Sequence, residues 1–262
     1  AIEQLKQAQA IKQTAEVEKL LAEAKDNYQQ HHYQLGTQHL AAENWEKAYQ
    51  EFKRVRQYGT YRKVEAKYQQ VYKQLKELKM KRIAVLKFGD SSRRFKLGSK
   101  ATSLFTAELL AKDPKFITVI EREQLTEILQ EQKLQATGLV NPDTTQKLGN
   151  ILGVDYLVVG KVIGGNVTTN KEEEWVDVYY ADKKKKQYII QKRAYTQIFF
   201  KLLEVNSAEV VLSKRVKKEE LYEESYYQGD SVLVPADEEI LDRAIEEAVA
   251  VFAQDVYDQF EL

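Results

Sequence analysis

The spacing of hydrophobic and polar positions changes once along the chain, close to Met80. Before this point the apolar residues recur at helical intervals, and the only glycines are Gly36 and Gly59. A stretch with so few helix breakers is expected to be mostly helical. Beyond it, short apolar runs alternate with helical faces. We therefore predict two domains, residues 1–80 and 81–262.

The first predicted helix carries a narrow apolar stripe among Gln, Glu and Lys residues. The stripe consists of Leu5, Ile11, Val17, Leu20 and Leu21. It is weaker than the apolar face of a typical core helix. Two arrangements stay open: this helix packs on a partner surface, or it projects from the domain.

The segment from Tyr33 to Phe52 has the spacing of a tetratricopeptide repeat. Gly36 and Ala48 allow two antiparallel helices to approach closely, and Phe52 fills the space between them. We expect Trp45 to open the second helix. The segment departs from the repeat consensus in that no proline closes it near Thr60. One repeat alone cannot bury its faces, so the predicted helix 61–78 is expected to pack against it.

The concave face of such a repeat is lined by its first helix. This geometry predicts a groove for a peptide or a partner protein. The candidate groove residues are Gln30, Tyr33, Thr37, Leu40 and Ala41.

The second domain begins with strands and helices in alternation, the pattern of an α/β domain. The predicted strands are 83–88, 116–120 and 154–163, and the predicted helices are 99–110, 121–134 and 141–153.

After Gly164 and Gly165 the chain becomes strand-rich, which predicts an added β-hairpin. The predicted strands are 175–180, 188–205 and 209–222, with a hairpin tip at 182–186. A last amphipathic helix, 237–260, presents apolar residues four apart on one face. We expect that face to cover a sheet.

Composition narrows the classes of function. The chain has 40 basic and 40 acidic side chains and no cysteine, which excludes thiol chemistry, iron–sulfur clusters and thiolate metal sites. Its longest apolar runs are far shorter than the roughly 20 residues of a membrane-spanning helix. The N-terminal residues carry no signal-peptide pattern, which leaves open whether such a segment was removed.

Candidate catalytic and metal-binding residues are few. His32, His39 and Glu43 return to one helix face, but packing or surface roles explain them better than a metal site does. Glu121, Glu123 and Glu131 could be paired carboxylates for acid–base chemistry. Acidic residues are favoured at a helix N-terminus, where Glu121 and Glu123 fall, and a structural role explains the set better, so we expect no catalytic role. We predict no enzyme activity, no metal and no cofactor.

Two basic clusters, 183–186 and 192–193, raise the question of nucleic-acid binding. Residues 219–262 hold 14 acidic side chains against Arg243 alone, and the net charge is zero. A solvated hairpin tip therefore explains the clusters better, and we predict no nucleic-acid partner. The first 80 residues carry 14 basic and 10 acidic side chains, an imbalance that slightly favours self-association.

The second domain, residues 81–262, resembles the CsgG family, whose namesake is the lipoprotein secretion channel for curli subunits. The matching segments, in family order, are 83–88, 116–125, 128–134, 137–140, 147–156 and 159–160. The resemblance implies an anticodon-binding-domain-like α/β fold in an envelope protein of a family whose members are usually exported and often acylated on a cysteine. It also implies a periplasmic location at the outer membrane, with membrane association through such an anchor only. Whether Ala1 was once attached to such a cysteine stays open.

The chain departs from the channel where the channel has lipid-facing hairpins. Residues 171–174, 183–186 and 191–193 are rich in charges, and 219–227 is short and acidic. A lysine or arginine on a lipid face at the bilayer midplane costs about 2 to 4 kcal/mol. The segment 91–98, at the position of the pore constriction, is also short.

We therefore expect a non-enzymatic envelope protein that works by binding. It would be a protein-binding scaffold or accessory component of an outer-membrane or periplasmic assembly, with ring formation as one form of self-association. The alternative is a lipoprotein regulator that binds and activates a peptidoglycan synthase. A secretion pore is less favoured.

Overall fold

The computed structural model describes residues 2–11, 14–91, 96–120, 146, 153–177 and 184–261. The chain divides into two compact units, Ala1–Met80 and Lys81–Glu261. The first is helical, and the second combines helices with a mixed β-sheet. Within the described residues, no helix is both long enough and apolar enough to cross a membrane.

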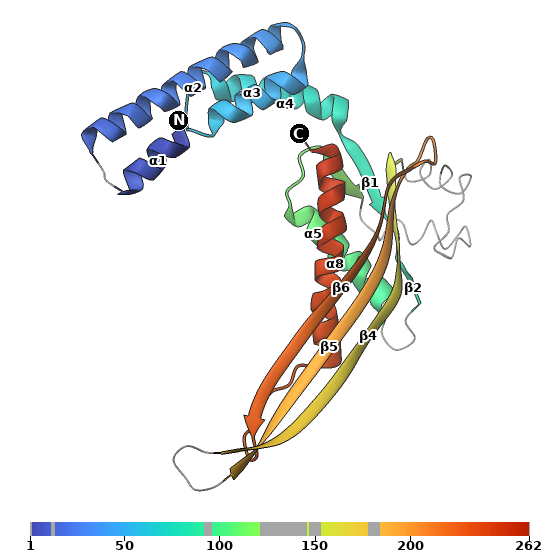
Figure 1. Ribbon diagram of the computed structural model, residues 1–262. Coiled ribbons are helices and arrows are strands. Elements are labelled where there is room, and N and C mark those ends of the chain that lie inside the picture. Colours follow the sequence, from blue (N-terminus) through green and yellow to red (C-terminus); the bar gives the residue numbers. More distant parts are fainter. Residues whose placement is uncertain are drawn as a thin grey trace. The chain divides into compact units, whose positions relative to one another are not determined.

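The helical unit contains α1 (Ile2–Ile11), α2 (Ala15–Ala41), α3 (Trp45–Arg56) and α4 (Val64–Lys79), drawn in blue to cyan in Figure 1. The prediction of one helix from Leu5 to Leu21 was wrong. Thr14 has an extended backbone, and its side chain accepts a hydrogen bond from the Val17 amide at 3.3 Å, so it starts a new helix. The segment α1 packs against α2 rather than projecting.

The predicted packing of α2 on α3 is confirmed. Ala48 and Phe52 are fully buried, and a Cβ on Gly36 would lie only 2.7 Å from the Phe52 ring. Helix α3 begins at Trp45, as expected, after a turn in which Glu43 has a φ of 54°. Gln29 ties the pair further by donating to the carbonyl oxygens of Val55 at 3.0 Å and Gly59 at 3.2 Å. Whether these helices form a tetratricopeptide repeat stays a prediction.

The second unit is built on a six-stranded sheet in the order β3-β1-β4-β5-β6, with β2 paired to β4. Strands β1 (Lys81–Val85), β2 (Gly89–Asp90), β3 (Ile117–Ile120) and the start of β4 (Tyr156–Asp177) pair in parallel. Strands β4, β5 (Lys184–Glu204) and β6 (Val210–Tyr227) are antiparallel neighbours. The sheet is therefore mixed, with a long three-stranded antiparallel part.

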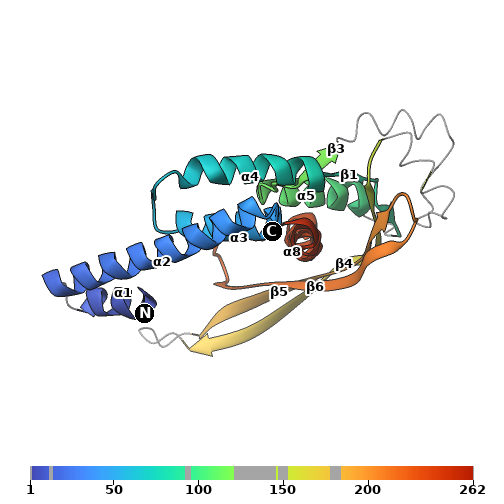
Figure 2. The same ribbon diagram turned by 90° about the horizontal axis from the view of Figure 1, so that it is seen from above.

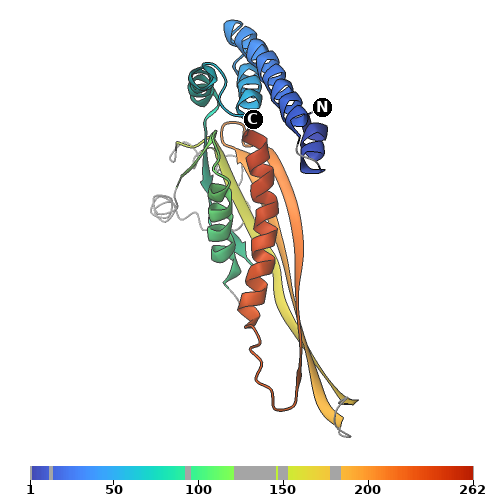
Figure 3. The ribbon, with the colours of Figure 1, turned by 90° about the vertical axis from the view of Figure 1, so that its left-hand side faces the viewer.

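Helices α5 (Leu97–Ala111) and α8 (Asp237–Phe260) lie on one face of this sheet, as Figures 2 and 3 show. The prediction for α8 is confirmed in both its bounds and its role. Four phenylalanines join the layers: Phe252 of α8 stacks on Phe200 of β5 at 4.8 Å, and Phe105 and Phe88 pack beside them. All four are at most 1% exposed. This cluster forms the centre of the main core.

The predicted break at Gly164 and Gly165 was wrong, because β4 continues through both glycines to Asp177. Trp175 therefore belongs to β4 and does not open a separate strand. The glycines mark a shift in register beside Val162 and a close approach, since a Cβ on Gly165 would overlap the Leu97 side chain. Hydrogen bonding to β5 along the whole strand outweighs the local turn preference of glycine.

The predicted helices 121–134 and 141–153 lie outside the described residues, apart from Gln146 and Gly153, and so do residues 182–183 of the predicted tip. The candidate acidic residues Glu121, Glu123 and Glu131 also lie there. The assignment of 184–186 to the tip was wrong, because these residues begin β5 and pair with 175–177 of β4.

Candidate binding surfaces

The five predicted groove residues all lie on α2. Four of them, Gln30, Tyr33, Thr37 and Leu40, are half-buried, and Ala41 is exposed. The Thr37 hydroxyl donates to the Tyr33 carbonyl oxygen at 2.9 Å, so it is engaged within its own helix.

The Tyr33 ring is packed inside the helical unit. Its centroid lies 6.0 Å from that of Phe52 and 5.6 Å from that of Tyr61. Two cations face the same ring, Arg62 at 5.6 Å and Lys67 at 5.7 Å. The structure therefore gives this part of the surface a basic border that the sequence reasoning missed, because Arg62 and Lys67 come from the segment after α3.

His32, which the sequence analysis considered and rejected as a metal ligand, contacts Glu51 instead. The Nδ1 atom of His32 lies 2.5 Å from Glu51 Oε2, and Arg54 donates to the other oxygen of Glu51 at 2.6 Å. The His32 ring also packs on Tyr28, with centroids 4.2 Å apart. Among the described residues, no group of three His, Cys, Asp or Glu side chains could hold a metal ion.

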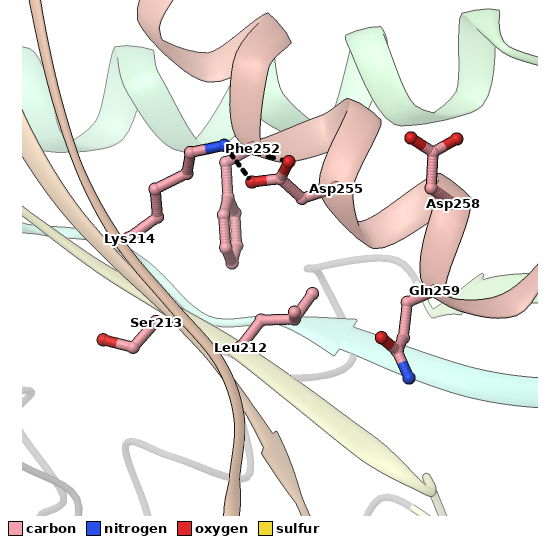
Figure 4. A pocket seen from close by; sticks show the side chains of 7 residues that line it. All are labelled: Leu212, Ser213, Lys214, Phe252, Asp255, Asp258 and Gln259. Atoms are coloured by element: carbon pink, nitrogen blue, oxygen red, sulfur yellow. Dashed lines mark hydrogen bonds and ion pairs between the residues drawn. The ribbon is translucent and has the colours of Figure 1, made fainter.

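A shallow pocket of about 410 Å³ lies between β6 and the C-terminal half of α8 (Figure 4). Lys214 reaches across it and donates to both carboxylate oxygens of Asp255, at 2.9 and 2.7 Å. Phe252 provides an apolar wall, and Asp258 adds a second carboxylate at the rim. The pocket holds an internal salt bridge, which fastens the helix to the strand. Sequence reasoning did not find it because its two halves are some 40 positions apart in the chain.

A second surface lies on the long strands beyond the start of α8. Tyr188 of β5 and Tyr226 of β6 face each other across the ladder and stack at 5.3 Å. Lys171 of β4 lies 4.4 Å from the Tyr188 ring and 5.9 Å from the Tyr226 ring. Lys186 also approaches Tyr188, at 5.4 Å. We call these four residues, together with Trp175, the ribbon cluster.

The strand register places the ribbon cluster on one face. Trp175 pairs with Lys186, and Glu173 pairs with Tyr188, so their side chains point to the same side of the sheet. Glu173 forms an ion pair with Lys186. The hydrogen bond that the Lys186 ammonium donates to the Glu173 carboxylate lowers the pKa of that carboxyl below its usual value. Trp175 is 63% exposed. The cluster thus combines aromatic rings and ammonium groups at an accessible position.

Comparison with solved structures finds distant similarities. The PelC dodecamer from Paraburkholderia phytofirmans is 12% identical, covers 70% of this chain and 90% of its own, and has a TM-score of 0.33. Lipoprotein GNA1162 from Neisseria meningitidis is 12% identical, with coverages of 68% and 96% and a TM-score of 0.34. The LpoB C-terminal domain from Escherichia coli is 16% identical, with coverages of 52% and 81% and a TM-score of 0.31. No function follows from similarities this distant.

A search of curated protein sequences finds no significant match to this chain. A family model gives a clear result. The family described as curli production assembly/transport component CsgG matches residues 64–254, most of the chain. The predicted resemblance is therefore confirmed, and the chain belongs to the CsgG family.

Proposed function

We propose that this chain is a non-enzymatic cell-envelope protein that acts as a protein-binding scaffold or accessory component of an outer-membrane or periplasmic assembly. Membership of a family described by assembly and transport supports this role. Self-association, with a ring as one form, is part of the proposal.

The ribbon cluster is the observation that carries the proposal. Helix α8 begins at Asp237, whose carboxylate accepts a hydrogen bond from Lys192 at 2.9 Å. Strands β4, β5 and β6 extend beyond this end of α8, as Figures 1 and 3 show. The ladder places Tyr188 and Tyr226 farther along these strands than Lys192. The rings of the ribbon cluster therefore contribute to a surface rather than to the main core.

Tyrosine and tryptophan are enriched in protein–protein interfaces because one side chain offers a large apolar area and a polar group. Lys171 adds a positive charge beside these rings, whereas Lys186 is paired with Glu173. A partner that presents carboxylates and an apolar patch would match both features.

The α2 groove is the second proposed contact. Gln30, Tyr33, Thr37, Leu40 and Ala41 would line a short site whose basic border, from Arg62 and Lys67, favours an acidic peptide. We expect its affinity to be lower than that of an array of several repeats, because the apolar area it offers is small.

Site-specific photo-crosslinking in the native host tests the proposal. A photoreactive residue replaces Trp175, and a matched variant carries the same residue at Ala107, an exposed position on α5. We expect a discrete crosslinked species from position 175 that position 107 does not give. Equal patterns from both positions would contradict a binding role for the ribbon.

The identity of the crosslinked protein separates the alternatives. A penicillin-binding protein would favour the regulator of peptidoglycan synthesis, and crosslinks to this chain itself would favour a homo-oligomeric scaffold. Light scattering over a hundredfold range of concentration, with and without detergent, then tests the ring. A single ring-sized species supports it, and a monomer under every condition rejects it.

A further inference from the structure

The outer edge of β6 is available for pairing. Strand β6 stands at the end of the strand order, and in the described part of the sheet its only neighbour is β5. It is 18 residues long. An edge strand of this length offers a row of backbone N–H and C=O groups to another strand.

The charges of β6 are arranged in two blocks of opposite sign. The basic block contains Lys214, Arg215, Lys217 and Lys218, and the acidic block contains Glu219, Glu220, Glu223 and Glu224. Charges on an edge usually discourage pairing between copies, because each copy brings like charges to the other. Two blocks behave differently, since reversing the strand direction places each block opposite its complement.

We propose that two copies of this chain pair antiparallel through their β6 edges, around a two-fold axis at Glu219. The inference deepens the proposed scaffold function and rests on it for the role of the contact. Its geometry rests only on β6 and its neighbours.

The register follows from symmetry. A two-fold axis perpendicular to the sheet keeps each face on its own side, so residues of the same face must pair. With the axis at Glu219, Arg215 lies opposite Glu223, Lys218 opposite Glu220, and Lys214 opposite Glu224. Each of these pairs occurs twice in the dimer.

Neighbouring registers are poorer. An axis at Lys218 places that lysine opposite its own copy. Lys217 opposite Glu219 is then the one pair of opposite charges that faces directly across the edge. An axis at Glu220 leaves Lys217 opposite Glu223 alone. The charge pattern therefore selects the register centred on Glu219.

Side chains on the helix-covered face of β6 are already engaged with α8. Lys214 binds Asp255, Lys218 lies 3.0 Å from Glu247, and Glu220 lies 4.0 Å from Arg243. These residues keep α8 in place and would share their charges between α8 and the second copy, so both faces of β6 contribute to the register.

Arg215, Lys217, Glu219 and Glu223 lie on the opposite face of β6 and are exposed. Glu223 accepts a hydrogen bond from Gln191 of β5 at 2.7 Å, and its other carboxylate oxygen would meet Arg215 of the second copy. Lys217 would lie diagonally between Glu219 and Glu223 of the second copy, within reach of a long side chain. Two lysines thus flank the pair of Glu219 side chains at the axis.

Such a contact closes on itself. Both copies use the same surface, so the contact makes a dimer and does not extend into a ring or a filament. It would add a two-fold link to whatever assembly the other surfaces form.

Charge-swap variants of the full chain test the pairing. The variant R215E/K217E makes the exposed face of β6 acidic, and E219K/E223K makes it basic. We expect each variant alone to dimerise at least about tenfold more weakly than the wild type at low salt, by sedimentation, because like charges then face each other. An equimolar mixture of the two should recover dimers, which a folding defect would not do.

A cysteine at the axis gives an independent test, because the chain has no cysteine of its own. Cross-strand Cα atoms lie within disulfide distance. Glu219→Cys should form disulfide-linked dimers under mild oxidation. The control, Ser225→Cys, lies on the same face, but two copies would stand about 40 Å apart in this register.

Three results would overturn the proposal: a monomeric wild type at about 100 μM, equal crosslinking of the two cysteine variants, or mixed charge variants that stay monomeric. None of them bears on crosslinking at Trp175, so the scaffold function is tested separately. A fourth result, a larger oligomer that the charge swaps leave unchanged, would reject the β6 contact while keeping self-association.

Discussion

At the scale of single residues, glycine and tyrosine positions carry the strongest constraints. Gly36 has no space for a side chain, since a Cβ would meet the Phe52 ring at 2.7 and 2.8 Å. Phe52 is fully buried and rigidly packed, so it has little room to move away. This close approach was predictable, because a glycine inside a long helix, followed by Ala48 and Phe52, indicates a helix contact.

Replacing Gly36 with alanine should destabilise the helical unit. Overpacking costs about 1 to 3 kcal/mol, and the gain in helix propensity returns about 1 kcal/mol at most. Urea unfolding followed by circular dichroism should therefore show a net loss of stability. The control is Gln34→Ala, at an exposed position of the same helix. Unchanged or higher stability of Gly36→Ala would show that Phe52 can move.

Tyr156 gives the second unit a dependence on alkaline pH. Burial, and then the charge of Glu204, raise the pKa of its hydroxyl above the usual 10.0. The folded state therefore holds this proton more tightly than the unfolded state does. The resulting stability is fully present below pH 10 and is lost as the pH rises through the raised pKa.

We expect Tyr156→Phe to remove this part of the alkaline loss. The measurement is the free energy of unfolding of both proteins between pH 8 and about pH 11. The wild type should lose more stability than the variant above pH 10. Parallel curves would contradict the assignment to Tyr156.

At the scale of elements, the start of α8 is fastened to β5. The Lys192 ammonium donates to the Pro235 carbonyl oxygen at 2.8 Å and to Asp237 at 2.9 Å. Its side chain is 12% exposed, and that of Asp237 is 26% exposed. Asp237, Glu238 and Glu239 in the first turn also favour this helix terminus electrostatically. The contacts of Lys192 with Pro235 and Asp237 therefore fix the position on β5 at which α8 begins to cover the sheet.

Replacing Lys192 with methionine should cost about 1 to 3 kcal/mol, because a partly buried carboxylate and a carbonyl oxygen each lose one charged donor. The matched control is Lys218→Met, which removes the more exposed ion pair with Glu247 and should cost less than about 1 kcal/mol. Hydrogen exchange should speed up in the first turns of α8 for the first variant only. Equal effects of the two substitutions would contradict this ranking.

At the scale of the whole molecule, the family match and the division into compact units differ at one boundary. The match begins at Val64, the first residue of α4, whereas the second unit begins at Lys81. Helix α4 buries Val64, Val71 and Leu75 in the helical unit, where it packs on α3. Both hydrophobic clusters of the second unit consist of residues from Ile83 onward.

We therefore expect the fragment 81–262 to fold without α4. Its unfolding midpoint in urea should equal that of the fragment 64–262, because α4 without α3 would have three apolar residues and no partner. A fragment 81–262 that does not unfold cooperatively would show that α4 belongs to the CsgG fold itself.

Local periodicity by itself determined much of this protein. It predicted α3, α8, the contact of Gly36 with Phe52 and the positions of strands β1, β3 and β4, and the motif order identified the CsgG family. Such features are readable because burial on one face of a helix or strand leaves a regular pattern in the sequence.

Tertiary structure decided what depends on distant partners. Pairing with β5 carried β4 through two glycines, the side chain of Thr14 divided the first helix, and packing around Tyr33 enclosed part of the predicted groove. The ribbon cluster combines residues of three strands, so no single segment of the sequence could predict it. The two charge blocks of β6 were visible in the sequence, but only the strand order showed that they lie on a strand that, in the described part of the sheet, is paired on one side only.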